Sequence, residues 1–506
     1  MSAGISIVNT SARVLPLRAR MPFRFGISRV TRVPHVIVRV EVAVGGRRAA
    51  GVAADSLMPK WFTKNPHTGF RADIDELREA VLSGCEVARM AGRDGESVFA
   101  LWHAVHGEQL RRGGARGWPH LLANFGASLI ERALIDAVCR LHAMPFHAAL
   151  VRNLFGVRLE KIYPELAGMG PAEVVPSVPV SRIRVRHTVG LSDPLTRGDL
   201  TAGEWPDDGL PVCLEDVIAR HGIRRFKIKV SDDTEKNLVR LRAIAAVIGE
   251  ALGDDHVFTL DGNESWRTPE AFEDFWRSAS KDTVLRRWFR RLRFIEQPLH
   301  RDCALCGDGI RAMLARLQDA GPMPPVIIDE SDAEVDTLAR ALAAGYAGTT
   351  HKNCKGVFKS VANLALLRHR GPALAGGGTG ILSGEDLTNV GPVALPQDLC
   401  VTGALGIDDL ERNGHHYFAG LRGFPEALSA PMARHHADVF ARTKGEAGRG
   451  FLAVRIDGGR IGCASLHRQA GLGPVELADV AALPSLEDDA DWAAVVAALE
   501  ASPDED

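Results

Sequence analysis

The sequence predicts an α/β fold built around a TIM-like barrel, and two observations support this prediction. First, apolar segments that resemble strands recur along the chain and end in charged residues, which are Lys229, Asp261, Glu296, Asp329 and, after a shorter segment, Lys352. These residues follow one another by 32, 35, 33 and 23 positions, about the length of a strand plus a crossover helix. Second, charged residues at successive strand ends are typical of an active site at the C-terminal mouth of a barrel.

Length and composition limit the classes of protein that fit. With 506 residues the chain is long enough for a barrel and a second domain. The formal net charge of -2 predicts no nucleic-acid partner and no attraction to an acidic membrane. No apolar run approaches the roughly 18 residues that cross a membrane, and the first residues lack the features of a signal peptide. The scattered cysteines indicate reduced thiols, which favours a cytoplasmic location.

Residues 1–155 are predicted to form an α+β domain. Valines alternate along 36–44, two glycines follow, and 49–54 returns, a pattern that indicates a β-hairpin. Apolar residues at helical spacing occur at 74–85 and again, more strongly, at 129–141. Both helical stripes are expected to form core and to contribute no chemistry.

A loop with two aromatic residues lies between the hairpin and the first helix. It spans 58–69 and contains Trp61 and Phe62, which look exposed in the sequence. Such a loop covers a ligand in one interpretation and is a poorly packed connection in the other. Three further stretches, near 94–125, 192–212 and 268–291, are interpreted as insertions.

Residues 156–420 are predicted to form the barrel. Its first strand is expected at 182–191 and its second at 225–230, after which Ser231 to Thr234 caps the helix that leads to the third strand. The last two strands are harder to place because their apolar runs are short. We expect the seventh to enter Gly376 to Gly380 and continue to Asp386, and the eighth at Leu405 to Asp408.

Residues 421–506 are predicted to return to the first domain. The segments 451–456 and 461–463 flank two glycines and indicate a hairpin that resembles the N-terminal region more than the barrel. The tail after Pro484 is acidic and carries a short helical patch from Trp492 to Leu499. We expect this tail to be partly mobile.

The three carboxylates at the strand ends predict a metal site. Carboxylates that converge from adjacent strands do not stay ionised at close quarters without a cation. Asp261, Glu296 and Asp329 supply only hard oxygen, which favours Mg²⁺, with Mn²⁺ as an alternative. The other interpretation is three separate salt bridges to arginines of the barrel. Asn263 and Glu330 are expected to support the metal ligands from behind.

The lysines predict acid–base chemistry. Alternation along the second strand places Lys227 and Lys229 on one face, although an exposed strand edge would explain two lysines as well. A lysine serves as a base when its pKa falls towards neutrality, and the neighbouring Lys227 ammonium is expected to lower the pKa of Lys229. Lys352 would face Lys229 across the barrel. A substrate carboxylate between them would then lose its α-proton, leaving an enediolate.

These motifs together resemble the enolase superfamily, and more narrowly its muconate lactonizing enzyme-like subgroup within the mandelate racemase/muconate lactonizing enzyme family. The matching motifs are Lys227-Ile-Lys229, Asp261-Gly-Asn263, Glu296-Gln-Pro298, Asp329-Glu-Ser331 and Lys352-Asn-Cys-Lys355-Gly356. The resemblance implies a (β/α)7β barrel with an α+β capping domain that is formed by the N-terminal region and the C-terminal return. It also implies that the three carboxylates are Mg²⁺ ligands and that Lys229 and Lys352 are the acid/base pair, with Lys227 as a third catalytic lysine.

The function expected from these motifs is a Mg²⁺-dependent racemase, epimerase, cycloisomerase or dehydratase that acts on a small carboxylate. Two alternatives remain: a catalytically retired metal-binding barrel, and another metal-dependent TIM-barrel lyase or hydrolase. A homo-oligomer is expected by the same resemblance. Residues expected to contribute to substrate binding are Arg24, Trp61, Phe62, Glu385, Asp408, His415 and His416.

Overall fold

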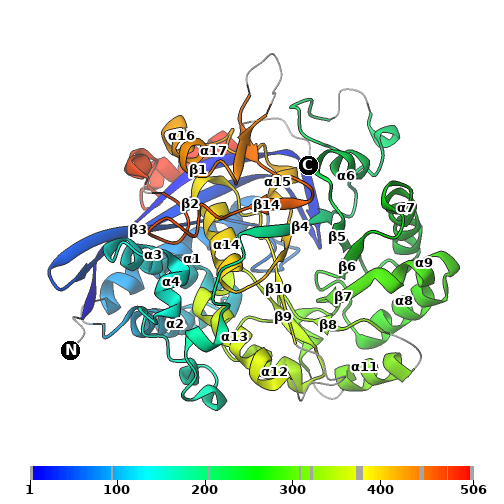
Figure 1. Cartoon of the computed structure of the whole chain (residues 1–506), viewed down its shortest axis with the longest axis horizontal. Helices are drawn as coiled ribbons and strands as arrows, with labels where there is room; N and C mark the ends of the chain where they lie inside the picture. Colours follow the sequence, from blue (N-terminus) through cyan, green and yellow to red (C-terminus); the bar gives the residue numbers. More distant parts are fainter. Residues whose placement is uncertain are drawn as a thin grey trace.

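The structure is a computed structural model, and it describes residues 4–92, 95–201, 205–306, 309–319, 323–371, 380–443, 450–475 and 477–501. A three-stranded sheet with its helices forms one side of the molecule, and a βα barrel forms the other (Figure 1). The C-terminal segment, orange to red in Figure 1, lies beside the blue N-terminal sheet.

The N-terminal sheet is antiparallel, in the order β1 (Ile5–Phe25), β2 (Ser28–Val44) and β3 (Arg47–Ser56). The predicted hairpin is confirmed as β2 and β3, with Val44 opposite Arg47. Gly45 and Gly46 have φ values of 56° and 80°, a left-handed turn that glycine adopts without steric cost. The long first strand was not predicted, because Pro16 and several polar residues interrupt its apolar pattern.

Three helices accompany this sheet, and α1 and α3 contact its strands. They are α1 (Phe70–Ala91), α2 (Val98–Ala115) and α3 (His120–Leu141). The two predicted helical stripes are confirmed in α1 and α3. The stretch interpreted as an insertion contains α2, which packs against both neighbours. β3 approaches α3 so closely that a Cβ on Gly51 would lie 2.2 Å from the carbonyl oxygen of Ala133. The helix α3 is therefore held flat against the sheet.

The eight strands of the barrel follow chain order around a ring, and neighbouring strands are parallel. A bridge between Ile328 and Thr349 joins the fifth strand to the sixth, so that the ring closes. The predicted barrel is confirmed. Its strands are β4 (Arg182–Val189), β5 (Arg225–Lys229), β6 (Val257–Asp261), β7 (Leu292–Glu296), β8 (Val326–Ile327), β9 (Gly348–His351), β10 (Ile381–Gly384) and β11 (Asp409–Arg412).

Helices follow the strands and cover the outside of the barrel (Figure 1). The clearest is α7 (Thr234–Leu252), where the side chain of Asp233 accepts a hydrogen bond from the backbone N–H of Lys236 and caps the helix. The other helices of the barrel are α6 (Leu214–His221), α8 (Pro269–Lys281), α9 (Thr283–Trp288), α10 (Arg301–Ala304), α11 (Gly309–Asp319), α12 (Thr337–Ala343), α13 (Val357–Arg370) and α14 (Gly391–Ala404).

The placement of the eighth strand was wrong by one segment. Leu405 is the C-cap of α14 and is 2% exposed, and Gly406 turns the chain with a φ of 79°. The apolar run at 405–408 therefore ends a buried helix, and the strand begins at Asp409. For the seventh strand, the structure has Ile381–Gly384, and the predicted entry at 376–379 lies outside the described residues.

The predicted C-terminal hairpin was also wrong. β13 (Leu452–Val454) pairs with β12 (Phe440–Arg442), whereas β14 (Arg460–Gly462) joins the barrel antiparallel to β4. Gly458 and Gly459 do turn the chain between β13 and β14, but these two strands pair with strands of different sheets.

The return to the first domain takes place at the end of the chain. α17 (Asp489–Glu500) packs against β1 and β2. Trp492 is 2% exposed, and its indole N–H donates to Asp75 over 2.8 Å. The expected partly mobile helical patch is therefore a docked helix, because Trp492 has an apolar site to fill. The division at 155/156 and 420/421 stays a prediction.

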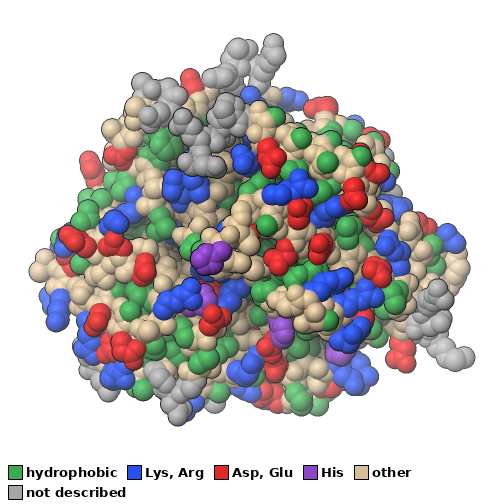
Figure 2. Space-filling view, turned by 180° about the vertical axis from the view of Figure 1, so that it is seen from behind, with side chains coloured by type: hydrophobic (Ala, Val, Ile, Leu, Met, Phe, Trp, Pro, Cys, Tyr) green, Lys and Arg blue, Asp and Glu red, His purple; other side chains and the backbone are tan. Residues whose placement is uncertain are grey.

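Charged side chains of both signs are spread over the surface. Figure 2 shows basic and acidic side chains interspersed over one face of the molecule, with hydrophobic side chains between them. Within the described ranges, no helix combines the length and the apolar character that crossing a membrane requires.

Candidate active site

The charged residues predicted at the strand ends meet inside the mouth of the barrel. Asp261 and Glu296 are the last residues of β6 and β7 and lie opposite each other in the strand pairing, and Lys229 lies opposite Asp261 in the same way. Parallel strands in register place their last residues at one level. All of these side chains are buried, as are those of Asp329 and Lys352.

Lys227 is the centre of this cluster. Its ammonium nitrogen lies 2.8 Å from Glu296 Oε1, 3.0 Å from Asp261 Oδ2, 2.5 Å from Glu385 Oε2 and 3.1 Å from Glu411 Oε2. The residue is 1% exposed, so the exposed-edge interpretation of the two lysines is wrong. One cation therefore holds four buried carboxylates together.

The two other predicted lysines each pair with one carboxylate. Lys229 Nζ lies 2.6 Å from Asp261 Oδ2, and Lys352 Nζ lies 3.3 Å from Asp329 Oδ2. β5 is the second strand of the ring and β9, which precedes Lys352, is the sixth. The two ammonium groups therefore reach the mouth from opposite sides of the barrel.

Two residues that sequence reasoning did not assign complete the cluster. Glu411 lies on β11, where its Oε1 accepts a hydrogen bond from Thr188 over 2.7 Å. It was missed because the eighth strand was placed too early. Lys355 lies 2.8 Å from Asp329 Oδ1 and also donates to the Asp329 carbonyl oxygen over 2.6 Å. Its signal was present in the Lys-x-x-Lys motif, which had no role attached to its second lysine.

The electrostatics of the cluster follow from burial and charge. Burial raises the pKa of Glu296 well above its ordinary value, and the neighbouring Asp261 and Glu385 carboxylates raise it further. For Asp261, burial acts in the same upward direction, but Lys227 and Lys229 outweigh it and the pKa falls below the ordinary value. Hydrogen-bonded ion pairs of this kind keep buried charges in place.

The pKa values of Lys352 and Lys227 lie above the ordinary lysine value. Burial by itself would lower the pKa of Lys352, but Asp329 outweighs it and the pKa rises. For Lys227, burial acts in the same downward direction, yet Asp261 and Glu296 raise its pKa well above the ordinary value. The sequence showed the neighbouring ammonium groups but not how close the acids would lie.

The donor set suits a hard divalent cation. Glu296 Oε2 and Glu330 Oε2 are buried and have no hydrogen-bond partner among the described residues, whereas Asp329 Oδ2 makes no hydrogen bond but lies 3.3 Å from the Lys352 ammonium. Buried carboxylate oxygens without partners are costly, and oxygen ligands are what Mg²⁺ prefers. Nevertheless, no group of three acidic, histidine or cysteine side chains in the described part of the chain is already gathered as a metal centre. The Lys227 ammonium lies between Asp261 and Glu296 instead.

The predicted supporting residues lie directly behind the carboxylates. The backbone N–H of Asn263 donates to Asp261 Oδ1 over 2.8 Å, and its side-chain amide donates to Glu330 Oε1 over 3.1 Å. Burial raises the pKa of Glu330 to about 7, with a further contribution from Asp329. Asn263 therefore links two acidic residues of different strands.

The aromatic loop of the capping region covers the mouth. Its aromatic side chains, which look exposed in the sequence, are buried. Trp61 is 4% exposed, and its ring centroid lies 5.7 Å from Lys352 Nζ, within the range of a cation–π contact. Phe62 is 1% exposed and packs against Phe125, with ring centroids 4.5 Å apart. Trp61 thus faces the site, whereas Phe62 belongs to the core of the cap.

Arg301, at the start of α10 in the barrel, ties this loop down. Its guanidinium donates to the carbonyl oxygens of Trp61 and Phe62 over 2.9 and 2.8 Å and to Glu264 over 2.7 Å. A small cavity lies between the loop and the barrel. Its lining includes Phe23, Phe25, Met58 and Trp61 from the cap and Lys229, Asn263, Lys352, Asp386, Leu387, Thr388, Glu411 and Asn413 from the barrel.

The structure does not bring every predicted substrate-binding residue to this cavity. Arg24 is exposed, and it alternates with Phe23 and Phe25, which line the cavity. Asp408 precedes β11, at the end of the barrel opposite the mouth, and pairs there with Arg184. Glu385 is buried in the cluster around Lys227, as described above.

The two histidines lie outside the barrel wall. His415 Nε2 is 3.4 Å from His187 Nδ1, and the rings of His187 and His416 are 4.8 Å apart. Thr188, the next residue on β4, points into the barrel towards Glu411. Because neighbouring residues on a strand alternate, His187 and its partners face outwards.

A capped βα barrel with acids and lysines at its strand ends is the architecture that the motifs predicted for the enolase superfamily. Comparison with known proteins agrees: residues 212–383 match the family model described as enolase C-terminal domain-like. That segment runs from the helix before β5 to β10 and contains the predicted acids and lysines of the barrel as far as Lys355. The predicted resemblance to this superfamily is confirmed. No curated protein matches the chain.

Solved structures share the whole architecture at low sequence identity. An enolase from Bradyrhizobium, complexed with magnesium and mandelic acid, is 16% identical, with a TM-score of 0.56 over 95% of this chain and 99% of that one. A dipeptide epimerase from Enterococcus faecalis, complexed with Mg and a dipeptide, is 13% identical, with a TM-score of 0.57 over 93% and 100%. A muconate lactonizing enzyme from Pseudomonas fluorescens, complexed with muconolactone, is 16% identical, with a TM-score of 0.55 over 95% and 98%. These likenesses show the fold.

Proposed function

We propose that this protein is a Mg²⁺-dependent enzyme that removes the α-proton of a small carboxylate substrate and forms an enediolate. The observation that supports it most directly is that Lys229 and Lys352 line one cavity from opposite sides of the barrel. Similar structures bind mandelic acid, a dipeptide and muconolactone, which supports a small carboxylate or its derivative as the ligand class. The reaction is a racemisation or epimerisation, a cycloisomerisation or a dehydration.

The acids have the holding role in this proposal. Asp261, Glu296 and Asp329 would bind the cation, and Glu296 Oε2, which has no hydrogen-bond partner among the described residues, is available to it. When bound, Mg²⁺ supplies positive charge that stabilises the negative charge on the substrate carboxylate. Asn263 and Glu330 orient the ligands through the hydrogen bonds described above.

The lysines have the proton-transfer role. A neutral amine on one side of an α-carbon can remove its proton, and an ammonium on the other side can donate a proton to the opposite face. Lys352 carries a proton in its ion pair with Asp329, because that pair raises its pKa, so its Nζ is placed to donate. Lys227 is enclosed by four carboxylates and does not line the cavity, so we assign it the task of holding the acids in place.

The cap closes the site. Trp61 packs over Lys352 and, with Phe23 and Phe25, forms an apolar roof. An apolar roof excludes water, which strengthens the electrostatic interactions of the acids and lysines beneath it. A homo-oligomer stays a prediction.

Exchange of the α-proton in D₂O tests the proposal. A mixture of small α-substituted carboxylic acids, incubated with the protein and Mg²⁺, should incorporate deuterium at the α-carbon of any acid that binds productively. Lys229→Met and Lys352→Met should each reduce exchange by at least about a hundredfold for the stereoisomer whose proton they face. Mass spectrometry of each enantiomer measures the result.

Lys359→Met is the matched control. Lys359 is also a buried lysine, 2.9 Å from Asp332, but it lies outside the cavity, and exchange should persist. Absence of exchange with every acid, in the presence of bound Mg²⁺, would instead support a retired barrel. Exchange that survives in both active-site variants would remove the lysines from the mechanism.

A further inference from the structure

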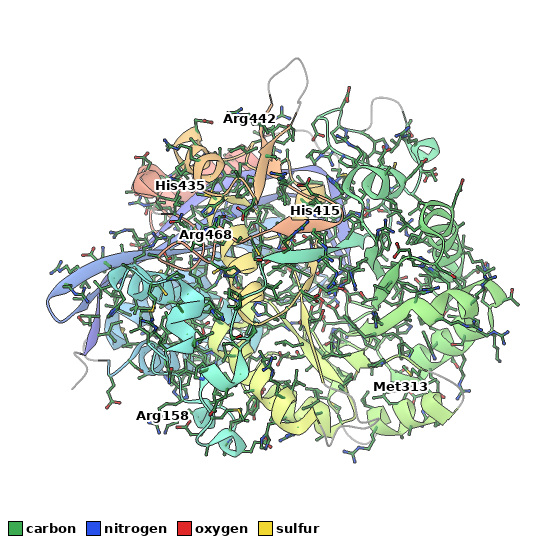
Figure 3. The ribbon with its side chains drawn as sticks, in the orientation of Figure 1. Arg158, Met313, His415, His435, Arg442 and Arg468 are labelled. Carbon is green, nitrogen blue, oxygen red and sulfur yellow. The ribbon has the colours of Figure 1, made fainter. Side chains whose placement is uncertain are left out.

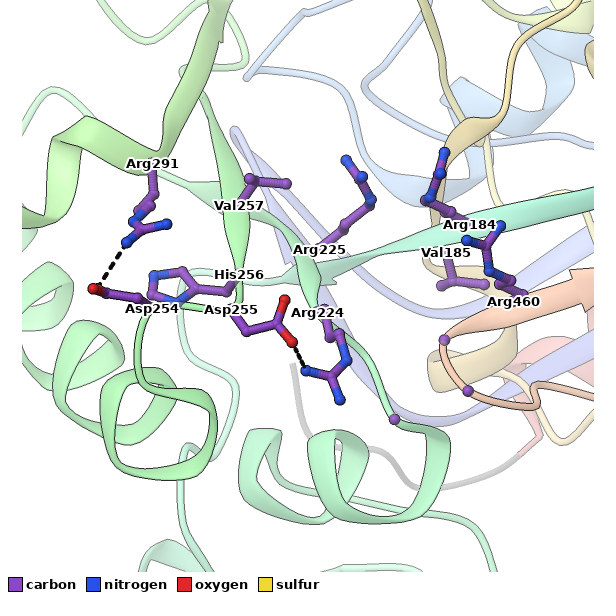
Figure 4. Close-up of a pocket in the computed structure, with 13 residues that line it drawn as sticks. Arg184, Val185, Arg224, Arg225, Asp254, Asp255, His256, Val257, Arg291 and Arg460 are labelled. Atoms are coloured by element: carbon purple, nitrogen blue, oxygen red, sulfur yellow. Dashed lines mark hydrogen bonds and ion pairs between the residues drawn. The ribbon is translucent and has the colours of Figure 1, made fainter.

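A second cavity lies at the opposite end of the barrel from the mouth. Its volume is about 340 Å³, and it is surrounded by the N-terminal ends of β4, β5 and β6, the segment before β7, and β14 (Figure 4). The lining residues that matter for its chemistry are basic: Arg184, Arg224, Arg225, Arg291 and Arg460.

Basic side chains outnumber acidic ones in the lining of this cavity, where five arginines meet Asp254 and Asp255. Four of the arginines have an acidic partner: Arg184 pairs with Asp408, Arg225 with Asp409, Arg224 with Asp255 and Arg291 with Asp254. Arg460 comes from the C-terminal segment, where β14 places it opposite Arg184 of β4 in the strand pairing. No acidic side chain among the described residues pairs with the Arg460 guanidinium. Because Arg184 has Asp408 as its partner, Arg460 is the arginine of this lining whose charge no acid among the described residues compensates, and such a guanidinium attracts an anion.

Two of the four ion pairs at the cavity lie between solvent-exposed side chains and can be replaced. Arg224 pairs with Asp255, and the two side chains are 55% and 74% exposed. Arg291 pairs with Asp254 over 2.9 Å, with side chains 35% and 83% exposed. Ion pairs in contact with solvent contribute about 0–1 kcal/mol, and Figure 4 shows both pairs as dashed lines. A stronger anion can therefore displace the aspartates.

The remaining lining leaves the centre of the cavity open. His256 does not compete for a ligand, because its Nε2 accepts from Trp288 over 2.8 Å and its Nδ1 bonds to the Gly253 carbonyl over 2.9 Å. Gly459, with a φ of 70°, lies so close to Gly222 that a Cβ would be 2.7 Å from its carbonyl oxygen. Side chains at these positions would narrow the cavity.

We propose that this cavity binds a small phosphate-bearing anion, such as a phosphate monoester or a diphosphate. A guanidinium donates two parallel hydrogen bonds to phosphate oxygens, and several guanidiniums from different strands match a multiply charged tetrahedral group better than a single carboxylate. The volume suits a small molecule. A long polyanion such as nucleic acid would need a continuous basic track. The site is separate from the proposed active site and does not depend on it.

Calorimetric titration of the Mg²⁺-free protein with inorganic phosphate and with pyrophosphate, at constant ionic strength, tests the proposal. Pyrophosphate should bind at one saturable site per chain. Arg460→Gln and Arg224→Gln should each weaken this binding by about tenfold or more. Arg158→Gln is the charge-matched control, because Arg158 lies at the lower edge of the molecule in Figure 3, away from the cavity, and is 60% exposed in its side chain. It should leave binding unchanged.

Three results would overturn the proposal. One is the absence of saturable pyrophosphate binding. Another is binding that both cavity variants leave intact. The third is tighter binding of tricarballylate than of pyrophosphate, which would assign the cavity to polycarboxylates. Circular dichroism checks that the variants fold. If Arg460→Gln fails to fold, Arg224→Gln decides the question, because the Arg224 side chain is exposed and its replacement should not disturb the fold.

Discussion

At the scale of single residues, the site is governed by how closely acids and lysines are packed. Lys227 contacts four carboxylates, and Asp329 is contacted by both Lys352 and Lys355. The attraction between opposite charges is stronger where water is excluded. Removing one partner of such a group therefore leaves the remaining partner as an unpaired buried charge, which destabilises the protein. Among the acids, Glu296 combines a raised pKa with a partnerless oxygen.

Replacing that carboxylate is therefore the sharpest test of the metal site. Glu296→Gln should weaken Mg²⁺ binding by at least about tenfold, because a neutral amide replaces an ionised oxygen ligand while the side-chain volume is kept. Calorimetric titration with Mg²⁺ measures the effect. Glu273→Gln, on α8 and paired with Arg277 and Arg316, serves as the control and should bind Mg²⁺ as the wild type does. Equal affinity in the two variants would exclude Glu296 as a ligand.

At the scale of elements, one contact joins the cap to the loop that carries Lys352. Glu131, in the middle of α3, accepts hydrogen bonds from the backbone N–H groups of Val357 and Phe358 over 2.9 and 2.7 Å. These are the first residues of α13, whose N–H groups have no partner within the helix. A helix of the cap therefore caps a helix of the barrel, just after the Lys352 to Lys355 segment.

The protonation of Glu131 gives this contact a predicted pH dependence. Burial raises the pKa of Glu131 to about 7, above its ordinary value of about 4.3 in an unfolded chain. A raised pKa means that the contribution to stability is full below about pH 4.3 and is lost as the pH rises through about 7. The stability of the wild type relative to Glu131→Gln should therefore fall between pH 5 and pH 8. Denaturant unfolding at several pH values measures it.

A second variant serves as the reference for the pH dependence of Glu131→Gln. Glu76→Gln, at a half-buried position on α1 where the carboxylate bonds to Thr63, should show a smaller change over the same pH range. A stability difference for Glu131→Gln that is constant from pH 5 to pH 8 would contradict the assignment.

At the scale of the whole molecule, opposite charges run through the barrel interior from end to end. Arg225 pairs with Asp409 over 2.7 Å, Asp409 with Arg186 over 2.9 Å, and Arg186 with Glu385 over 2.5 Å. Glu385 then contacts Lys227 at the mouth. A continuous series of ion pairs inside the barrel thus connects the arginine-lined cavity with the candidate active site. Each charge in it is compensated by its neighbours, which is how buried ions are retained.

The C-terminal helix α17 packs against the sheet of the cap. Trp492 is buried against the cap, and the Arg78 guanidinium lies 5.3 Å from its ring centroid. Trp492→Ala should lower the free energy of unfolding by about 3–5 kcal/mol, the usual loss for a large buried aromatic. Thermal and denaturant unfolding measure this, and Val284→Ala, at a side chain 52% exposed, should change little. A loss under about 1 kcal/mol for Trp492→Ala would mean that α17 contributes little to the cap.

The sequence by itself determined the barrel, the order of its charged strand ends and the predicted resemblance. The alternation of apolar residues along a strand and the spacing between strand ends can be read from the sequence alone. Asp261, Glu296 and Lys227 were found in this way, because each lies in a short motif at the end of a predicted strand. The eighth strand escaped prediction because the apolar run at Leu405 fits a helix end as well as a strand, and with it Glu411 was missed.

Only the tertiary structure decided which charges meet and which side chains are covered. Trp61 looks exposed in the sequence, yet the cap buries it over Lys352. The pKa of Lys352 rises because Asp329 lies close to it in space, and the distance to an acid sets the balance between burial and charge. Arg184 and Arg460 are far apart in sequence and become neighbours when β14 joins β4. Contacts between distant segments depend on how the strands pair in space, and no local pattern records that pairing.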